Sequence, residues 1–300
     1  MSRVTDVRFI GYGVPDLDAE RAFYIGKWGL ELVSERGDAV WLKSAGHDEH
    51  HVVRLHRAAA VGTEVIAFST GTRADVDALH RRAEGAGLRI VHAPRELVGP
   101  GGGYGFRFFS PDGLPLEVSS DVSRGTARPL SHGDGLPVRI SHIVLHSPNP
   151  RDLAQFFVEV LGFRVSDWLG DFMCFLRCDS AHHRVAILPG PPCLNHVAYD
   201  MTGIDGMMSG IVRLRRVDVP VAWGPGRHTA GNNTFSYFVT PNGCTVEYTA
   251  ELEQVDDATW QSRVHAPSPR LMDQWGIGVG GPQSLPHAAA DPGLFQFVEV

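Results

Sequence analysis

The chain has few of the features that would mark several common classes of protein. It carries 4 cysteines in 300 residues and no C-x-x-C pair, so reduced thiols in a cytoplasmic protein are the simplest interpretation. No apolar run approaches the length of a membrane span. The net charge is −7 with no basic block, which argues against nucleic acids and membranes as partners. Apolar residues make up 43% of the chain, enough to bury a sizeable core.

Histidine, by contrast, is plentiful. Of the 15 histidines, 6 fall between positions 142 and 228, a clustering that suggests a site. Glycines gather at Gly99–Gly105, but they do not connect a strand to a following helix. A phosphate-binding loop needs both, so this run predicts a flexible loop and not a nucleotide site.

One pattern of predicted elements repeats along the chain: a strand, a capped helix and three further strands. In the fourth repeat the strand after the helix is predicted at Val217–Ala222. The four repeats begin near Val4, Glu64, Ile140 and Leu194. The sequence of Phe108–Glu117 parallels that of Phe238–Glu247, each with a Pro-x-Gly turn before the final glutamate. A repeat on this scale predicts a gene duplication.

The predicted fold is therefore α+β, with four βαβββ modules paired into two barrel-like domains. The segment 121–137 is rich in Ser, Gly, Pro and charge and has no periodicity, so it is the predicted linker. The domains are assigned to residues 1–125 and 137–300. The polar, Pro-rich tail after Glu253 is expected to wrap the second domain or cover it as a lid, with Trp260, Trp275 and Phe295 as packing points.

Aligning the two halves shows where they differ. Glu247 has a counterpart in Glu117, but His142 falls opposite Phe9 (or Arg8 with one gap) and His196 opposite Val65. A single histidine on a strand is more often a core or surface residue than a ligand. Three polar residues at matched strand positions, absent as a set from the sister half, favour a shared site.

Two imidazoles and one carboxylate on one side of a site form the facial triad of non-haem Fe(II) oxygenases. Such ligands hold Fe(II) or Mn(II) and leave coordination positions open, and zinc is a weaker alternative. His183, expected to begin a strand, and His228 and Tyr237 are predicted to lie nearby. A histidine near a metal but not bound to it is suited to acid–base chemistry.

The C-terminal half resembles the type I extradiol ring-cleaving dioxygenases of the vicinal oxygen chelate superfamily. The family signature runs from Gly-x-His through Tyr and Pro-x-Gly to a final Glu, and this chain matches it at Gly226, His228, Tyr237, Pro241, Gly243 and Glu247. The resemblance implies that His142, His196 and Glu247 are the metal ligands and that His183 is the acid–base residue. It further implies that His228 and Tyr237 contact substrate and oxygen, and that the N-terminal half is metal-free.

The same resemblance implies a catecholic substrate, O₂, Fe(II) with Mn(II) as the alternative, and a homo-oligomer. Two departures stand out. Asn195 occupies the position where many members have a second histidine, and Val144 the position where homoprotocatechuate-cleaving members carry Asn, which argues against that substrate. Two alternatives stay open: a metal-dependent isomerase or lyase of the glyoxalase type, and a non-catalytic protein that binds a small molecule.

Overall fold

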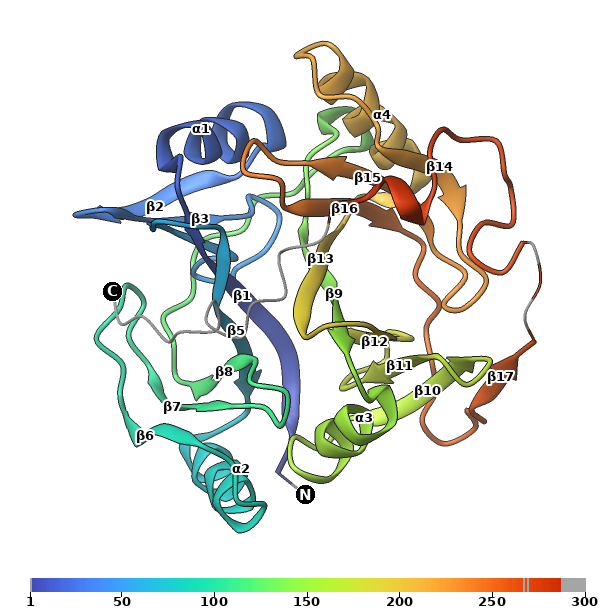
Figure 1. The fold of residues 1–300 in the computed structure, drawn as a ribbon. Coiled ribbons are helices and arrows are strands. Elements are labelled where there is room, and N and C mark those ends of the chain that lie inside the picture. The colour runs from blue at the N-terminus through green and yellow to red at the C-terminus, as the bar shows by residue number, and fades with distance from the viewer. Residues whose placement is uncertain (1, 267, 269, 287–300) are drawn as a thin grey trace.

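The computed structural model describes residues 2–266, 268 and 270–286, arranged around an 8-stranded and a 9-stranded sheet. The two sheets lie side by side, each strongly curved, with helices on their outer faces (Figure 1). Among the described residues, no helix is long and apolar enough to cross a membrane. The segment 121–138 joins the two sheets and contains a single 3-10 turn at His132–Asp134.

The N-terminal sheet has the strand order β2-β3-β4-β1-β5-β8-β7-β6. A π-helical segment, Phe23–Trp28, extends the first helix and ends at Gly29, which has a φ of 93°. The elements are β1 (Val4–Val14), α1 (Leu17–Ala22), β2 (Glu31–Arg36), β3 (Ala39–Lys43), β4 (Val53–Arg57), β5 (Gly62–Thr70), α2 (Arg73–Gly85), β6 (Ile90–Glu96), β7 (Tyr104–Phe109) and β8 (Pro115–Ser120).

The C-terminal sheet has the order β14-β15-β16-β13-β9-β12-β11-β10-β17, which is the N-terminal order read from the other end plus one added strand. The elements are β9 (Arg139–Ser147), α3 (Pro150–Glu159), β10 (Arg164–Leu169), β11 (Met173–Arg177), β12 (Val185–Pro189), β13 (Cys193–Asp200), α4 (Gly203–Arg215), β14 (Trp223–Arg227), β15 (Thr234–Val239), β16 (Thr245–Ala250) and β17 (Arg263–His265). The α+β fold of four βαβββ modules is confirmed.

Each module follows from local chemistry. In α3, Pro150 stands at the first turn, where a missing N–H costs nothing, and Leu153, Phe156 and Phe157 form one buried stripe. The chain leaves this helical region through Gly162, whose φ of 78° favours glycine. The stripe covers β10, β11 and β12, so the helix lies on the outer face and leaves the inner face of the sheet for a site.

The two halves share one core. Trp28, from the N-terminal half, is fully buried and stacks on Tyr248 of the C-terminal half with ring centroids 4.1 Å apart. It also meets Tyr199 and Phe238 edge-on. In the same region the side chain of Asn242, in the β15–β16 hairpin, donates to the Asp16 carbonyl at 2.9 Å, and Figure 1 shows this hairpin next to α1.

The prediction of a strand at Val217–Ala222 was wrong. This segment is a turn followed by irregular chain, and the strand lies later, at Trp223–Arg227. Pro220 has no N–H for a ladder hydrogen bond, so the segment cannot pair regularly. Pairing with β15 begins at Ala222, whose N–H donates to the Tyr237 carbonyl at 2.8 Å.

Candidate metal centre

Three neighbouring strands bring His142, His196 and Glu247 together. His142 lies on β9, His196 on β13 and Glu247 on β16, and β13 is the middle strand. Ala198 on β13 is the register partner of both His142 and Glu247. His196 precedes Ala198 by two residues and so projects from the same face of the sheet. The small side chain of Ala198 leaves the space between them open.

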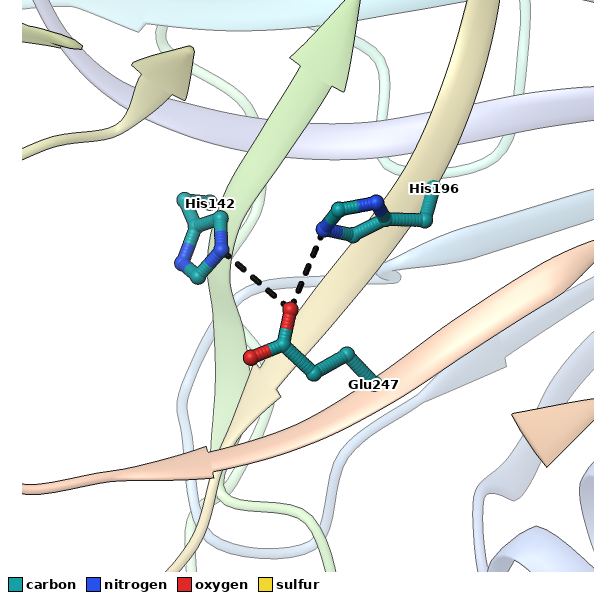
Figure 2. A group of neighbouring side chains, drawn as sticks. All are labelled: His142, His196 and Glu247. Atoms are coloured by element: carbon teal, nitrogen blue, oxygen red, sulfur yellow. Dashed lines mark ion pairs between the residues drawn. The ribbon is translucent and has the colours of Figure 1, made fainter. Parts of the chain in front are cut away.

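The three side chains converge on one point (Figure 2). Nε2 of His196 lies 3.1 Å from Oε2 of Glu247, and Nε2 of His142 lies 3.5 Å from the same oxygen. One candidate ligand atom from each residue falls within 4.8 Å of the others, and all three residues are buried. This separation matches the span of ligands around a single first-row metal ion.

The state of Glu247 fits a bound cation. Its side chain is 0% exposed, and among the described residues neither carboxylate oxygen meets the geometry of a hydrogen bond. Burial opposes its ionisation, but His142 and His196 hold the pKa of Glu247 below its ordinary range. A buried carboxylate is costly unless it is paired with a positive charge, and a divalent metal between the three groups would supply one.

Neighbouring side chains orient the two imidazoles. Nδ1 of His196 donates to Oδ1 of Asn195 at 2.6 Å, and Nδ1 of His142 lies 3.3 Å from Oγ of Ser141. Both rings therefore use Nδ1 for orientation and turn Nε2 towards Glu247, an arrangement typical of metal-binding histidines. The departure at Asn195 thus has a structural use, because its amide oxygen holds the ring of His196.

His183 lies beside this group, with its ring centroid 4.3 Å from that of His142. It does not begin a strand as predicted, since β12 starts at Val185, but it does line the pocket. Burial, followed by the proximity of His142, keeps the pKa of His183 well below its ordinary value.

Behind His183 runs a chain of hydrogen bonds that fixes its tautomer. Asp167 accepts from Nε2 of His182 at 3.1 Å, and Nδ1 of His182 lies 3.0 Å from Nδ1 of His183. Because Asp167 is a carboxylate, His182 carries its proton on Nε2 and accepts on Nδ1. His183 must then donate from Nδ1, which leaves its Nε2 unprotonated and able to accept a proton.

His228 and Tyr237 form the opposite wall. Nδ1 of His228 donates to the Met272 carbonyl at 2.6 Å, so its Nε2 accepts from the Tyr237 hydroxyl at 3.1 Å. Tyr237 is the register partner of Glu247 across β15 and β16. Burial, and then the charge of Glu247, raises the pKa of Tyr237 well above its ordinary value, so the phenol stays protonated and can donate.

The remaining pocket wall is mostly apolar, and part of it comes from the tail. The tail contributes Leu271, Met272, Pro282 and Leu285, so the expectation that it covers the second domain is confirmed for this segment. No periodicity in the sequence marks these four residues as pocket residues. Phe295 lies outside the described residues. The other apolar lining residues are Val144, Leu169, Met173, Phe175, Leu188, Trp223 and Ala230.

Fold and site together define a class: chains of paired βαβββ modules with a candidate His-His-Glu metal centre in one pair. Comparison with known proteins places the chain within it. Residues 7–118 match the model of the Glyoxalase/Bleomycin resistance protein/Dioxygenase superfamily. The crystal structure of an Mn(II)-bound glyoxalase from Novosphingobium aromaticivorans is 63% identical, with a TM-score of 0.97 over 99% of both chains. The chain belongs to this superfamily.

Two more distant proteins extend the comparison. The manganese-dependent 2,3-dihydroxybiphenyl 1,2-dioxygenase of Geobacillus genomosp. 3 is 26% identical over 82% of this chain and 85% of its own. Homoprotocatechuate 2,3-dioxygenase from Arthrobacter globiformis shares the fold, with a TM-score of 0.86 at 22% identity over 96% of this chain and 92% of its own.

Proposed function

We propose that the chain is an extradiol dioxygenase, which uses O₂ to cleave a catecholic ring next to its vicinal hydroxyls in aromatic compound degradation. His142, His196 and Glu247 would hold the metal, with Fe(II) the proposed ion and Mn(II) the alternative. The observation that carries the proposal is the grouping of these three residues with His183 on one side and the His228–Tyr237 pair on the other. The similarity to the dihydroxybiphenyl dioxygenase supports it.

When bound, the divalent metal supplies the Lewis-acid and redox chemistry at which catechol and O₂ meet. The chain supplies orientation and proton transfer. The apolar walls, including Val144 and Phe175, hold the ring and exclude water. The Tyr237 hydroxyl, held by His228, turns its single proton from Nε2 of His228 to an oxygen of the substrate when the substrate binds.

His183 is the proposed acid–base residue. Its unprotonated Nε2 takes a proton from a catechol hydroxyl as the substrate binds, and returns it to an oxygen atom as the ring opens. The hydrogen bonds from Asp167 through His182 keep Nδ1 of His183 as the donor throughout. A low pKa of His183 suits this role, because the ring is neutral until it receives the substrate proton.

A second candidate has an observation of its own: the 63% identical structure is described as an Mn(II)-bound glyoxalase. If the same three ligands held the metal, His183 could move a proton between neighbouring carbons of a 2-oxoaldehyde–thiol adduct. That reaction consumes no O₂. In that reaction the His228–Tyr237 pair would have no role in oxygen chemistry. The presence of this pair therefore favours the dioxygenase.

The test is to load the chain with Fe(II) or Mn(II) without oxygen, mix it with a panel of catechols in air, and record O₂ uptake and the visible spectrum. Stoichiometric O₂ uptake with a yellow product is expected. Two results together would overturn the dioxygenase proposal in favour of the isomerase. They are one metal per chain with no O₂ uptake on any catechol, and turnover of a 2-oxoaldehyde with a thiol. No metal at all would favour the small-molecule-binding protein.

We further propose that the active species is a cytoplasmic homo-oligomer. The resemblance to the extradiol family supports the oligomer, and the four free, buried cysteines agree with a reducing compartment. Light scattering of the metal-loaded protein should give a mass above that of one 32.7 kDa chain. A monomer at micromolar concentration would contradict it.

A further inference from the structure

The N-terminal sheet encloses a second cavity, of about 230 Å³, for which the proposed function has no use. It lies on the inner face of that sheet, and its strands include β1 and β8, the equivalents of β9 and β16 in the candidate metal centre. The glycine-rich loop after β6 lines it as well. The lining residues are Arg8, Phe9, Trp41, His51, Arg54, His92, Arg95, Leu97, Val98, Gly99, Pro100, Gly102, Arg107, Glu117 and Val122.

Strand register shows that this cavity is the sister of the metal pocket. Ala67 is the partner of both Phe9 and Glu117, as Ala198 is of His142 and Glu247. Phe9 therefore stands where His142 does, and Glu117 where Glu247 does. The N-terminal half therefore has the carboxylate but neither imidazole at these positions.

A histidine pair is retained as well. Val53 pairs with Ile10 as Val185 pairs with Ile143, which puts His51 at the position of His183. Nδ1 of His51 lies 3.0 Å from Nδ1 of His50, the same separation as in the C-terminal pair.

Guanidinium groups line this cavity, where the sister pocket has the candidate metal ligands. Arg107 stands opposite Glu117, as Tyr237 stands opposite Glu247, and its Nε donates to Glu117 at 2.7 Å. Arg54 is 2% exposed and pairs at 2.6 Å with Glu64, which is not part of the cavity wall. Arg8 pairs in the same way with Glu49, also outside the wall. The wall therefore presents several cations and a single carboxylate.

Polar atoms of this wall lack partners. Nε of Arg54 and Nε2 of His51 are buried, and among the described residues neither makes a hydrogen bond. Burial, opposed by Glu64 but reinforced by the charge of Arg107, lowers the pKa of Arg54, so the two guanidinium groups are close enough to repel. An anion between them would offset the repulsion and accept from Nε of Arg54. In the tautomer in which His50 donates across the 3.0 Å Nδ1–Nδ1 contact, Nε2 of His51 carries a proton and donates to the anion as well.

Apolar surface lies next to these cations, because Phe9, Trp41 and Leu97 line the same cavity. We propose that the N-terminal cavity binds a small organic carboxylate, with its carboxylate group on Arg54, Arg107 and His51 and its apolar part against Phe9 and Trp41. This site is separate from the metal centre and does not depend on the reaction proposed for it.

Benzoate is the probe, titrated calorimetrically into the metal-loaded chain and again after the metal is removed with a chelator. One benzoate per chain is expected in both titrations, because the cavity needs no metal. Binding that disappears with the metal would overturn the proposal, since the ligand would then sit at the C-terminal centre. Binding of inorganic phosphate without benzoate would overturn it too, because the apolar wall would have no part.

The decisive variant is Arg54→Met with Glu64→Met. Replacing a buried ion pair by apolar residues of similar volume is often tolerated by the fold. Loss of one charged donor should raise the Kd for benzoate by about tenfold or more. The matched control is Arg57→Met with Asp38→Asn. This ion pair is exposed, and Arg57 lies on the same strand as Arg54. The control should bind benzoate as tightly as the wild type does.

His51→Phe serves as a second variant, since it removes the unpartnered Nε2 without removing a charge. This variant should raise the Kd for benzoate about three- to tenfold. If the folded variants, checked by circular dichroism, bind benzoate as tightly as the control does, the proposal is wrong.

Discussion

Glu247 and Glu117 occupy the same position in two copies of one module, yet their surroundings differ. Glu247 faces two imidazoles, whereas Glu117 is paired with Arg107 at 2.7 Å. In the proposed assignment, the glutamate itself therefore does not decide whether a metal binds. The side chains on the neighbouring strands do, and they are histidines in one half and Phe9 and Val65 in the other.

Glu247→Gln should lower metal affinity by about 100-fold or more, because the amide cannot supply the anionic ligand. Metal content after dialysis, measured by plasma mass spectrometry, checks this. The matched control is Glu117→Gln, which changes the equivalent residue of the other half and should keep its metal. Equal metal content in the two variants would contradict the assignment of the centre.

His183→Phe should retain metal and lower turnover by about 10²–10⁴-fold, because the variant has no base beside the substrate. Oxygen uptake and metal content are measured on the same preparation. His80→Phe, a change to a histidine that packs on Phe106 in the N-terminal half, is the control for general damage. If His183→Phe lost its metal, His183 would be a ligand and the division of roles would be wrong.

Asp167 predicts a pH dependence of stability. Its side chain is fully buried, and His182, His265 and Arg263 donate to it. Burial opposes its ionisation, but these donors hold the pKa of Asp167 below its ordinary value near 4. The unfolded chain therefore binds the proton first, so this stabilisation is present above pH ~4 and is lost as the pH falls towards the folded-state pKa.

Asp167→Asn should accordingly lower the free energy of unfolding at pH 7 by about 2–4 kcal/mol. The difference in free energy of unfolding between variant and wild type should decrease below pH ~4. Urea unfolding between pH 3 and pH 8 tests both statements. A constant difference across that range would show that Asp167 is not the titrating group.

At the scale of elements, alternation and capping predicted the modules because the local signals agreed with the packing. The β14 strand is the exception, since Trp223-Gly-Pro-Gly-Arg227 resembles a turn in sequence. Only pairing with β15 makes it extended, and tertiary pairing has no local signature. The position of His183 before β12 was missed for a related reason, because the chain bends there to reach Glu253, whose carbonyl accepts from His182.

The tail segment gives a prediction of its own. Leu271 is buried against Val144 and Phe175 in the pocket wall. Leu271→Ala should raise KM about tenfold, with kcat nearly unchanged, because apolar contact with the substrate is lost but the reacting groups are not. Val264→Ala, at a 69% exposed position of the same tail, is the control. A loss of kcat with unchanged KM would show that the segment acts on the chemistry.

At the scale of the whole molecule, the duplication was readable from the sequence because the repeated motifs kept their spacing. The triad was readable because the two halves could be compared position by position, and strand register agrees with that comparison. The arginine-lined cavity was not foreseen. Its residues come from six strands and three connecting segments, and a cavity arises only when those segments are brought together.

Trp28 joins the two halves, so Trp28→Ala should destabilise the whole chain by about 3–5 kcal/mol. Unfolding should remain a single transition by both calorimetry and circular dichroism, because the core is shared. Trp275→Ala, at a 37% exposed position, should cost less than about 0.5 kcal/mol. Two separate transitions in the Trp28 variant would show that the halves fold independently.

The buried contact between Trp28 and Tyr248 also bears on the history of such a chain. Once a duplicated half contributes an aromatic side chain to its sister's interior, losing that half would expose the sister's apolar surface to water. Selection on the function of one half then preserves the other as a folding partner, while the inner face of the preserved half is free to change. Substitutions can accumulate on that face without loss of the fold, and a new ligand site can arise there.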